Sequence, residues 1–201
     1  MQIRKLILGS MMTNAYILGE SNVALVDPGS NAKGIYDYLK KENLTLEAIL
    51  VTHGHFDHIG ALCELKKLSG AKVYMHKSDM CMMGDMEKSL GFMMNVAPEV
   101  CEVDVVLYGG EEIHFGDDFV KVLHTPGHSR GSVSYIGDGF VCCGDLIFKE
   151  SIGRYDYGNF SDEMDSIDRL LSLLDMETVI LPGHGEETTV CHERENNPYI
   201  R

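Results

Sequence analysis

The chain lacks the features that direct a protein to nucleic acid, to a membrane or to export. Its 201 residues carry 17 basic against 31 acidic side chains, a formal net charge of -14, which repels phosphate backbones and anionic surfaces. No apolar run reaches the roughly 20 residues of a transmembrane helix. The first 20 residues also lack the long apolar stretch and cleavage site of a signal peptide. We therefore expect a cytoplasmic protein that binds neither nucleic acid nor membrane.

Cysteine is sparse as well. The six cysteines include an adjacent pair, Cys142 and Cys143, but no CxxC motif, and they are too few for the disulfide framework of a small secreted domain. We expect all six thiols to be reduced. Internal repeats, low-complexity tracts and linkers are also missing. With 44% hydrophobic residues the chain can bury a sizeable core, so residues 1–201 are expected to form one domain.

Hydrophobic periodicity predicts alternating strands and helices. The expected strands span residues 3–8, 14–18, 23–26, 48–51, 73–75, 119–123, 133–136, 140–143 and 178–181. The expected helices span residues 32–41 and 59–68, with a third beginning at an N-cap on Ser161 and carrying an apolar stripe from Phe160 to Leu174. The methionine-rich segment 78–99 favours adaptable core packing, with a flap that contacts ligand as the alternative.

Four of these strands are followed by side chains that bind metals. VTHGHFDHIG, residues 51–60, places three histidines and an aspartate within six positions, and HTPGH, GD and PGHG follow three later strands. The candidate ligands are His53, His55, Asp57, His58, His128, Asp145 and His184. Ligands bind at the carboxyl ends of strands in layered α/β folds, so loops far apart in sequence can converge there. The neighbouring glycines permit the tight backbone paths that such convergence requires.

Seven ligands suit two metal ions better than one. A tetrahedral zinc takes about four ligands, whereas a pair of ions about 3.5–4 Å apart shares a carboxylate and takes more. The expected first site is His53, His55 and His128, the expected second site is Asp57, His58 and His184, and Asp145 bridges the two. Zinc is the favoured metal, and iron or manganese also suit mixed histidine and carboxylate ligands.

The remaining histidines have weaker context. His124 lies four residues before His128, where a role behind the ligands or a structural role is favoured over direct ligation. His76, His114 and His192 are interpreted as surface or packed residues.

With these residues in view, the sequence resembles the metallo-β-lactamase superfamily, whose signature HxHxDH is found at residues 53–58. The resemblance covers nearly the whole chain and includes, in the family's order, Asp27 in VDPG, His128, Asp145 in CGD and His184 in LPGHG. It implies an α/β fold of the αββα type, in which two mixed β-sheets pack together with helices outside and metals at one edge. It also implies that Asp27 supports the ligands from behind.

Two stretches look like the short glyoxalase II-like (hydroxyacylglutathione hydrolase-like) enzymes of this superfamily: SIGRYDYGNF, residues 151–160, and PGHGEETTVCHERENNPYI, residues 182–200. Classical glyoxalase II enzymes carry a further helical domain that contributes to glutathione binding, and this sequence ends soon after the last metal motif. The resemblance therefore implies thioester hydrolysis rather than specificity for glutathione.

The same resemblance places Arg154 and Tyr155 in a loop beside the metals. Arginine's planar fork can bind a substrate carboxylate through two parallel hydrogen bonds. The alternative is a surface arginine that pairs with Asp156 or Asp162, and Lys149 is close enough in sequence to take over its role.

The chemistry expected from this resemblance is hydrolysis by a metal-bridging hydroxide. Two cations lower the pKa of a shared water from about 15.7 towards about 7, and Asp57 is expected to orient the hydroxide and accept a proton. The expected substrate is a small anionic acyl thioester such as S-lactoylglutathione, because the metals form a positive focus in an acidic protein. A secreted β-lactamase is disfavoured, because it predicts a cysteine in place of Asp145 and an export signal. The alternatives left open are a mononuclear-iron persulfide dioxygenase, a lactonase and a metal-binding module without catalysis.

Overall fold

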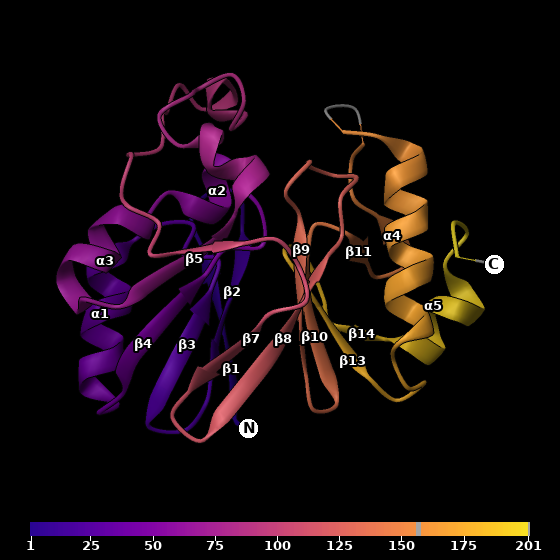
Figure 1. The fold of residues 1–201 in the computed structure, drawn as a ribbon, viewed down its shortest axis with the longest axis horizontal. Helices are drawn as coiled ribbons and strands as arrows, with labels where there is room; N and C mark the ends of the chain where they lie inside the picture. Colours follow the sequence, from indigo (N-terminus) through magenta and orange to yellow (C-terminus); the bar gives the residue numbers. More distant parts are fainter. Residues whose placement is uncertain (156–157, 201) are drawn as a thin grey trace.

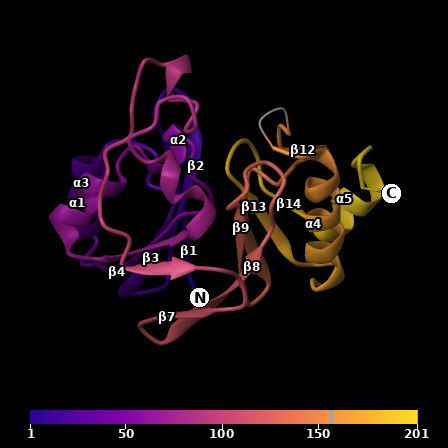
Figure 2. The same ribbon diagram turned by 45° about the horizontal axis from the view of Figure 1, so that its top comes forward.

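Two mixed β-sheets pack face to face in the computed structural model, with helices on both outer sides (Figure 1). The structure describes residues 1–155 and 158–200. In both views α1 and α3 cover one sheet and α4 and α5 cover the other (Figure 2). This arrangement confirms the expected αββα sandwich.

The first sheet is built by the N-terminal half of the chain, with strand order β1-β2-β3-β4-β5-β6. Its strands are β1 (Ile3–Leu8), β2 (Thr13–Leu18), β3 (Asn22–Val26), β4 (Thr45–Leu50), β5 (Lys72–His76) and β6 (Val105–Leu107). Its helices are α1 (Ala32–Lys41), α2 (Phe56–Ile59) and α3 (Leu62–Ser69), followed by the 3₁₀ helices η1 (Lys77–Met82) and η2 (Gly91–Met93).

The second sheet is built by the C-terminal half, with strand order β14-β13-β10-β9-β8-β7. Its strands are β7 (Glu112–Phe115), β8 (Asp118–His124), β9 (Val133–Gly137), β10 (Phe140–Gly144), β13 (Val179–Pro182) and β14 (Thr188–Thr189). A small hairpin, β11 (Ile147–Phe148) and β12 (Ser151–Ile152), follows β10, and the helices are α4 (Phe160–Ser172) and α5 (Val190–Asn196).

Strand direction brings several strand ends to one edge of the sandwich. Strands β3, β4 and β5 are parallel. Strands β8 and β10 both run antiparallel to β9, and β13 is parallel to β10. The carboxyl ends of β8, β10 and β13 therefore leave the second sheet at the same edge. Hydrogen bonds cross to the first sheet there: Asn14 N donates to Gly183 O at 2.7 Å and Val133 N donates to Thr52 O at 2.8 Å.

The core has three apolar layers. Between the sheets lie side chains such as Tyr16, Leu50 and Phe115, while the outer layers fill the spaces under α1 with α3 and under α4 with α5. The stripe on α4 is buried or partly buried from Met164 to Leu174, with Ile167 and Leu170 fully enclosed, but the prediction is wrong for Phe160, which is 46% exposed. Each such side chain contributes about 1.5–3 kcal/mol relative to exposure, so the core holds the strand ends in fixed positions.

All nine predicted strands are present, with shifts at their ends, and the helix at residues 32–41 is confirmed. Two predictions about helices are wrong. The helix expected at 59–68 is divided into α2 and α3, because Gly60 packs against the backbone of Gly29 and Ala61 N donates to Pro28 O at 2.9 Å. The N-cap of α4 is Asn159 rather than Ser161, since the Asn159 side chain accepts from Asp162 N at 3.1 Å. Strands β6, β7, β11, β12, β14 and helix α5 were not predicted.

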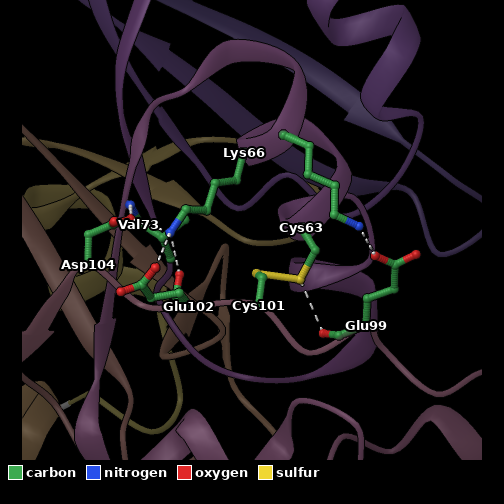
Figure 3. The surroundings of a disulfide bond; sticks show 8 residues. Cys63, Lys66, Val73, Glu99, Cys101, Glu102 and Asp104 are labelled. Carbon is green, nitrogen blue, oxygen red and sulfur yellow. Dashed lines mark hydrogen bonds and ion pairs between the residues drawn. A yellow bond between two sulfur atoms is a disulfide. The ribbon is translucent and has the colours of Figure 1, made fainter.

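The expectation of six reduced thiols is also wrong. Cys63 on α3 and Cys101 form a disulfide with a Cα–Cα distance of 5.4 Å (Figure 3). Residues 38 apart meet here because the segment after η2 folds back on α3, where Lys66 also pairs with Asp104 at 2.8 Å. Disulfides are rare in cytosolic proteins, so this bond does not support the expected cytoplasmic location. The other four cysteines are free, and burial raises the pKa of the Cys143 thiol to about 12.

The methionine-rich segment divides into two parts. Met80 and Met83 pack against the first core layer, as expected. Met93 and Met94 are 48% and 47% exposed, so the core-packing interpretation is wrong for them. Within the described part of the chain, no helix is long and apolar enough to cross a membrane.

Candidate metal centre

The seven predicted ligand side chains converge at the edge where the strands end. The ligand atoms of His53, His55 and His128 lie within 4.8 Å of one another and form the first half-site. Those of Asp57, His58 and His184 do the same and form the second half-site. A third overlapping group consists of Asp27, His53 and His58.

Asp145 lies between the two half-sites. Its Oδ1 is 3.4 Å from His58 Nε2, and its Oδ2 is 3.7 Å from His128 Nε2 and 3.6 Å from His184 Nε2. It follows β10, and Gly183 leaves room for it, because a Cβ at Gly183 would overlap Asp145 Oδ1. Oδ1 thus faces the second half-site, and Oδ2 faces a histidine of each half-site, a placement that suits a shared carboxylate.

The first half-site is nearly closed to solvent. His53, His55 and His128 are 1%, 5% and 6% exposed. His128 Nε2 lies 2.9 Å from His55 Nδ1. Burial, together with the neighbouring histidines, lowers the pKa of His53 well below its ordinary value and that of His55 to about 2. Both imidazoles are therefore neutral, the form that binds a metal ion.

The second half-site is more open and more charged. The side chains of Asp57 and His184 are 12% and 27% exposed, and His184 Nε2 lies 3.1 Å from Asp57 Oδ2. Burial lowers the pKa of His58, but three surrounding carboxylates, of which Asp145 contributes most, raise it to about 10. Burial raises the pKa of Asp57, but His58 and His184 bring it well below its ordinary value. The half-site thus concentrates negative charge around nitrogen ligands.

Asp27 supports the second half-site from behind. Its Oδ2 lies 2.8 Å from His58 Nδ1, and its carboxylate accepts hydrogen bonds from Thr52 N at 2.8 Å and Thr52 Oγ1 at 2.6 Å. A carboxylate on Nδ1 fixes the ring and directs Nε2 toward the centre. Asp27 follows β3 with φ 51°, a left-handed conformation that turns the chain sharply at the sheet edge. These contacts match the role that the resemblance implied for Asp27.

Asp79 supports the first half-site and was not predicted from the sequence. This residue of η1 is fully buried. Its carboxylate accepts hydrogen bonds from Gly54 N at 2.9 Å, Ser129 Oγ at 2.6 Å and Gly131 N at 2.7 Å. Gly54 separates His53 from His55, and Ser129 follows His128. One carboxylate therefore joins the two loops that carry the first half-site, and no local pattern marks an aspartate in a methionine-rich stretch for this role.

Glu163 of α4 is a second buried acid that was not predicted. It packs under the loop of His128, where glycines leave room because a Cβ at Gly127 or Gly153 would contact its carboxylate. Burial raises the pKa of Glu163 to about 8. The carboxyl is therefore mainly protonated at neutral pH and adds little charge to the centre.

The donor atoms of the centre fit divalent metal ions. Three ligand atoms of the centre, His53 Nε2, His58 Nε2 and Asp145 Oδ1, are buried without a hydrogen-bond partner. Leaving such atoms unsatisfied costs about 1–3 kcal/mol each, and a bound cation would satisfy all three. Imidazole and carboxylate ligands in this number suit zinc, iron or manganese.

Two other predicted residues lie in the loop after Asp145. His128 Nδ1 donates to the backbone carbonyl of Arg154 at 2.7 Å, which leaves Nε2 to face the centre. The Arg154 side chain is exposed, and Tyr155, 41% exposed, packs on Phe160 with ring centroids 4.8 Å apart. The alternative partner Asp156 lies outside the described residues. Substrate contacts of Arg154 and Tyr155 stay predictions.

The other histidines stand apart from the centre. The ring of His124 stacks on that of His76 with centroids 4.1 Å apart, and its Nε2 lies 3.0 Å from Arg130 O. These contacts give His124 a structural role, because they do not reach any of the predicted metal ligands. His76 is packed, as expected, while His114 is exposed and His192 lies 3.0 Å from Glu150.

Known proteins share both the sequence pattern and the fold. The family model described as Metallo-beta-lactamase superfamily matches residues 8–184. The chain is 37% identical to the probable metallo-hydrolase YqgX of Bacillus subtilis, covering 100% of this chain and 98% of that protein. It is 30% identical to the hydroxyacylglutathione hydrolase GloC of Haemophilus influenzae, covering 90% and 88%.

Two solved structures are similar over their whole length. The BLEG-1 B3 metallo-beta-lactamase superposes with a TM-score of 0.93 at 33% identity, covering 99% of both chains. TTHA1623 in a di-iron-bound form superposes with a TM-score of 0.87 at 34% identity, covering 98% of this chain and 99% of that one.

Proposed function

The chain belongs to the metallo-β-lactamase superfamily, and on this premise we propose that it hydrolyses small acyl thioesters with two divalent metal ions. The membership supports a metal-dependent hydrolytic enzyme. The two-metal count rests on one observation: Asp145 lies within 3.4–3.7 Å of ligands from both half-sites. The thioester rests on the resemblance of residues 151–160 and on the 30% identity to a hydroxyacylglutathione hydrolase.

The residues of the centre have separate roles in binding the metal ions and in positioning the attacking water. Bound divalent ions would lower the pKa of a shared water to about 7 and polarise a substrate carbonyl. His53, His55 and His128 would hold one ion, Asp57, His58 and His184 the other, and Asp145 both. Thr13 Oγ1 donates to Asp57 Oδ2 at 3.1 Å and fixes that carboxylate. Asp57, ionised because of its histidine neighbours, is placed to orient the attacking water.

Bond cleavage needs no side-chain acid in this proposal. A thiolate is a stable leaving group near neutral pH, because free thiols have a pKa of about 8.5. The centre holds three carboxylates, Asp27, Asp57 and Asp145, so two divalent ions would leave one net positive charge before a hydroxide forms and none once it has formed. The loaded centre would therefore not repel an anionic acyl thioester.

Metal analysis and substrate comparison test the proposal together. We expect about two metals per chain and hydrolysis of S-lactoylglutathione that far exceeds hydrolysis of phosphodiesters. Zinc is expected, and the similar protein with bound di-iron makes iron the second choice. A fully active protein with one iron, which consumes oxygen with glutathione persulfide, would replace hydrolysis by the dioxygenase alternative. Turnover of a lactone but of no thioester would favour the lactonase.

A second candidate is β-lactam hydrolysis, because the fold superposes on a B3 metallo-beta-lactamase over 99% of both chains. We place it second because the resemblance of residues 151–160 and the 30% identity to a hydroxyacylglutathione hydrolase support a thioester. The same preparation should be assayed with a β-lactam such as a cephalosporin. A kcat/KM for the β-lactam above that for every thioester would reverse the order of the two candidates.

A further inference from the structure

Two cavities lie beside the metal centre, one at each half-site. The first, about 280 Å³ and here called the apolar cavity, is lined by Asp57 of the second half-site together with Phe56, Met11, Met94 and Val96. The second, about 410 Å³ and here called the cationic cavity after its arginine, is lined by His55 and His128 of the first half-site together with Glu87, Lys88, Ser129 and Arg130. If the scissile thioester bond lies between the half-sites, the acyl group would point to one cavity and the leaving thiol to the other.

The apolar cavity presents hydrophobic side chains to solvent next to a metal ligand. Met11, Met94 and Val96 are 37%, 47% and 44% exposed. Among the described residues that line it, Asp57 is the one with a charged side chain. Methionine is unbranched and polarizable, so it adapts to ligands of varied shape. Exposed apolar surface in a concave site marks a place where an apolar group binds.

The cationic cavity contains an arginine that forms no ion pair with the described carboxylates. Lys88 is paired with Asp85 at 2.7 Å, so its charge is largely used within the protein. Arg130 is exposed, and it also lines an adjoining cavity of about 360 Å³ with Ser129 and Asn159. The alternative is that Arg130 is a solvated surface residue that binds no ligand. Its position two residues after His128, in a chain with 17 basic against 31 acidic residues, favours a binding role.

From these cavities we infer that the substrate has an apolar acyl group, which lies in the apolar cavity, and an anionic leaving thiol, whose carboxylate binds Arg130. This inference rests on the proposed function, because it needs the scissile bond to lie between the half-sites. The reverse orientation is disfavoured, since it would place the carboxylate beside Asp57 without a cation and would bury the acyl chain against Arg130. Carboxylate binding by arginine is bidentate and gains strength where water is displaced.

The inference is tested with acetyl and hexanoyl thioesters of two thiols that differ by one carboxylate, N-acetylcysteine and N-acetylcysteamine. For the metal-loaded protein, kcat/KM should rise at least about tenfold from acetyl to hexanoyl, since each buried methylene contributes up to about fourfold. The anionic thiol should be preferred about tenfold, as one charge-assisted pair allows.

Two variants test the binding of the acyl group and the binding of the thiol carboxylate separately. Met94→Gln should reduce the preference for hexanoyl at least threefold and leave the preference for the anionic thiol unchanged. Arg130→Gln should raise KM about tenfold for N-acetylcysteine thioesters, with kcat and the neutral series unchanged. The matched controls are Met176→Gln, with a similar exposure of 45%, and Lys41→Gln, whose side chain is 80% exposed on α1. Thermal unfolding verifies that all four variants are folded.

A non-hydrolysable thioether, S-hexyl-N-acetylcysteine, separates failure of this inference from failure of the proposed function. Calorimetry should show binding that weakens in Met94→Gln and in Arg130→Gln. Thioester hydrolysis without either preference would overturn the inference and leave the proposed function. Binding that depends on Met94 and on Arg130, without any hydrolysis, would overturn the proposed function alone. If neither binding nor hydrolysis is seen, the inference and the proposed function are both overturned.

Discussion

The two half-sites of the metal centre are built in different ways. The first is nearly closed, consists of neutral histidines, and is supported by Asp79 from the segment that connects β5 to β6. The second is open at His184, carries Asp57, and is supported by Asp27 at the junction of β3 and β4, inside the first sheet. One half-site therefore depends on how a long connection docks, and the other depends on the sheet itself.

Docking of that connection is secured at its far end. The disulfide between Cys63 and Cys101 and the ion pair of Lys67 with Glu99 at 3.0 Å attach it to α3 (Figure 3). We therefore expect the first half-site to respond more strongly than the second to changes at Asp79 and at the disulfide.

The largest effect is expected where the half-sites are joined. Asp145→Ala should lower metal content from about two ions to less than one and reduce thioester hydrolysis more than about a hundredfold, since loss of a supporting residue alone costs 10–100-fold. His58→Ala should remove mainly the second ion. Elemental analysis of both variants measures the difference, and an equal loss of one ion in each would show that Asp145 is not shared.

The comparison is sharpened by removing each supporting carboxylate. Asp79→Asn should weaken the first half-site about 10–100-fold and Asp27→Asn the second by a similar factor, because an amide offers one acceptor oxygen where the carboxylate offers two. Stepwise titration against a competing chelator resolves the two affinities. Asp104→Asn is the matched control, since Asp104 lies in the same connection and bonds Val73 N and Lys66 away from the centre. Equal weakening of both half-sites by either variant would contradict the assignment.

Breaking the disulfide tests whether docking reaches the first half-site. Reduction with a dithiol, or Cys63→Ser, should lower the free energy of unfolding by about 2–4 kcal/mol, as expected for a disulfide that closes a loop of this size. The affinity of the first half-site should fall a few-fold while that of the second is unchanged. Cys191→Ser is the control because this cysteine is free. A midpoint of denaturant unfolding that does not respond to the dithiol would refute a stabilising role.

The smallest effect concerns the predicted substrate arginine in the loop that holds His128. Arg154→Ala should raise KM for S-lactoylglutathione a few-fold and leave kcat nearly unchanged, because a uniform binding contact is lost. Lys149 pairs with Glu186 at 2.6 Å, so we expect it to replace Arg154 poorly. The double variant Arg154→Ala with Lys149→Ala completes the measurement. A wild-type KM in both would remove Arg154 from carboxylate recognition.

The sequence by itself was sufficient for the layered fold and for the set of residues that converge. Strands β10 and β13 are apolar runs, while Glu47 and Lys121 interrupt the apolar residues of β4 and β8. Each of the four strands is followed by ligand-type residues, so the carboxyl ends of the strands bring His53, His128, Asp145 and His184 together. Asp27 was reached through the resemblance alone, because an isolated VDPG turn has no pattern that marks it as a support for His58.

Only the tertiary structure decided what surrounds that centre. Asp79 contacts Gly54 and Ser129, 25 and 50 residues away, and Cys63 meets Cys101 across 38 residues. The apolar cavity likewise combines the β1–β2 turn, α2 and Met94, and the cationic cavity combines η1 with the loop that follows His128. Periodicity and motifs report the local conformation and the face of one element, whereas these contacts depend on where a long connection between strands docks, which is set by packing and by hydrogen bonds between distant segments.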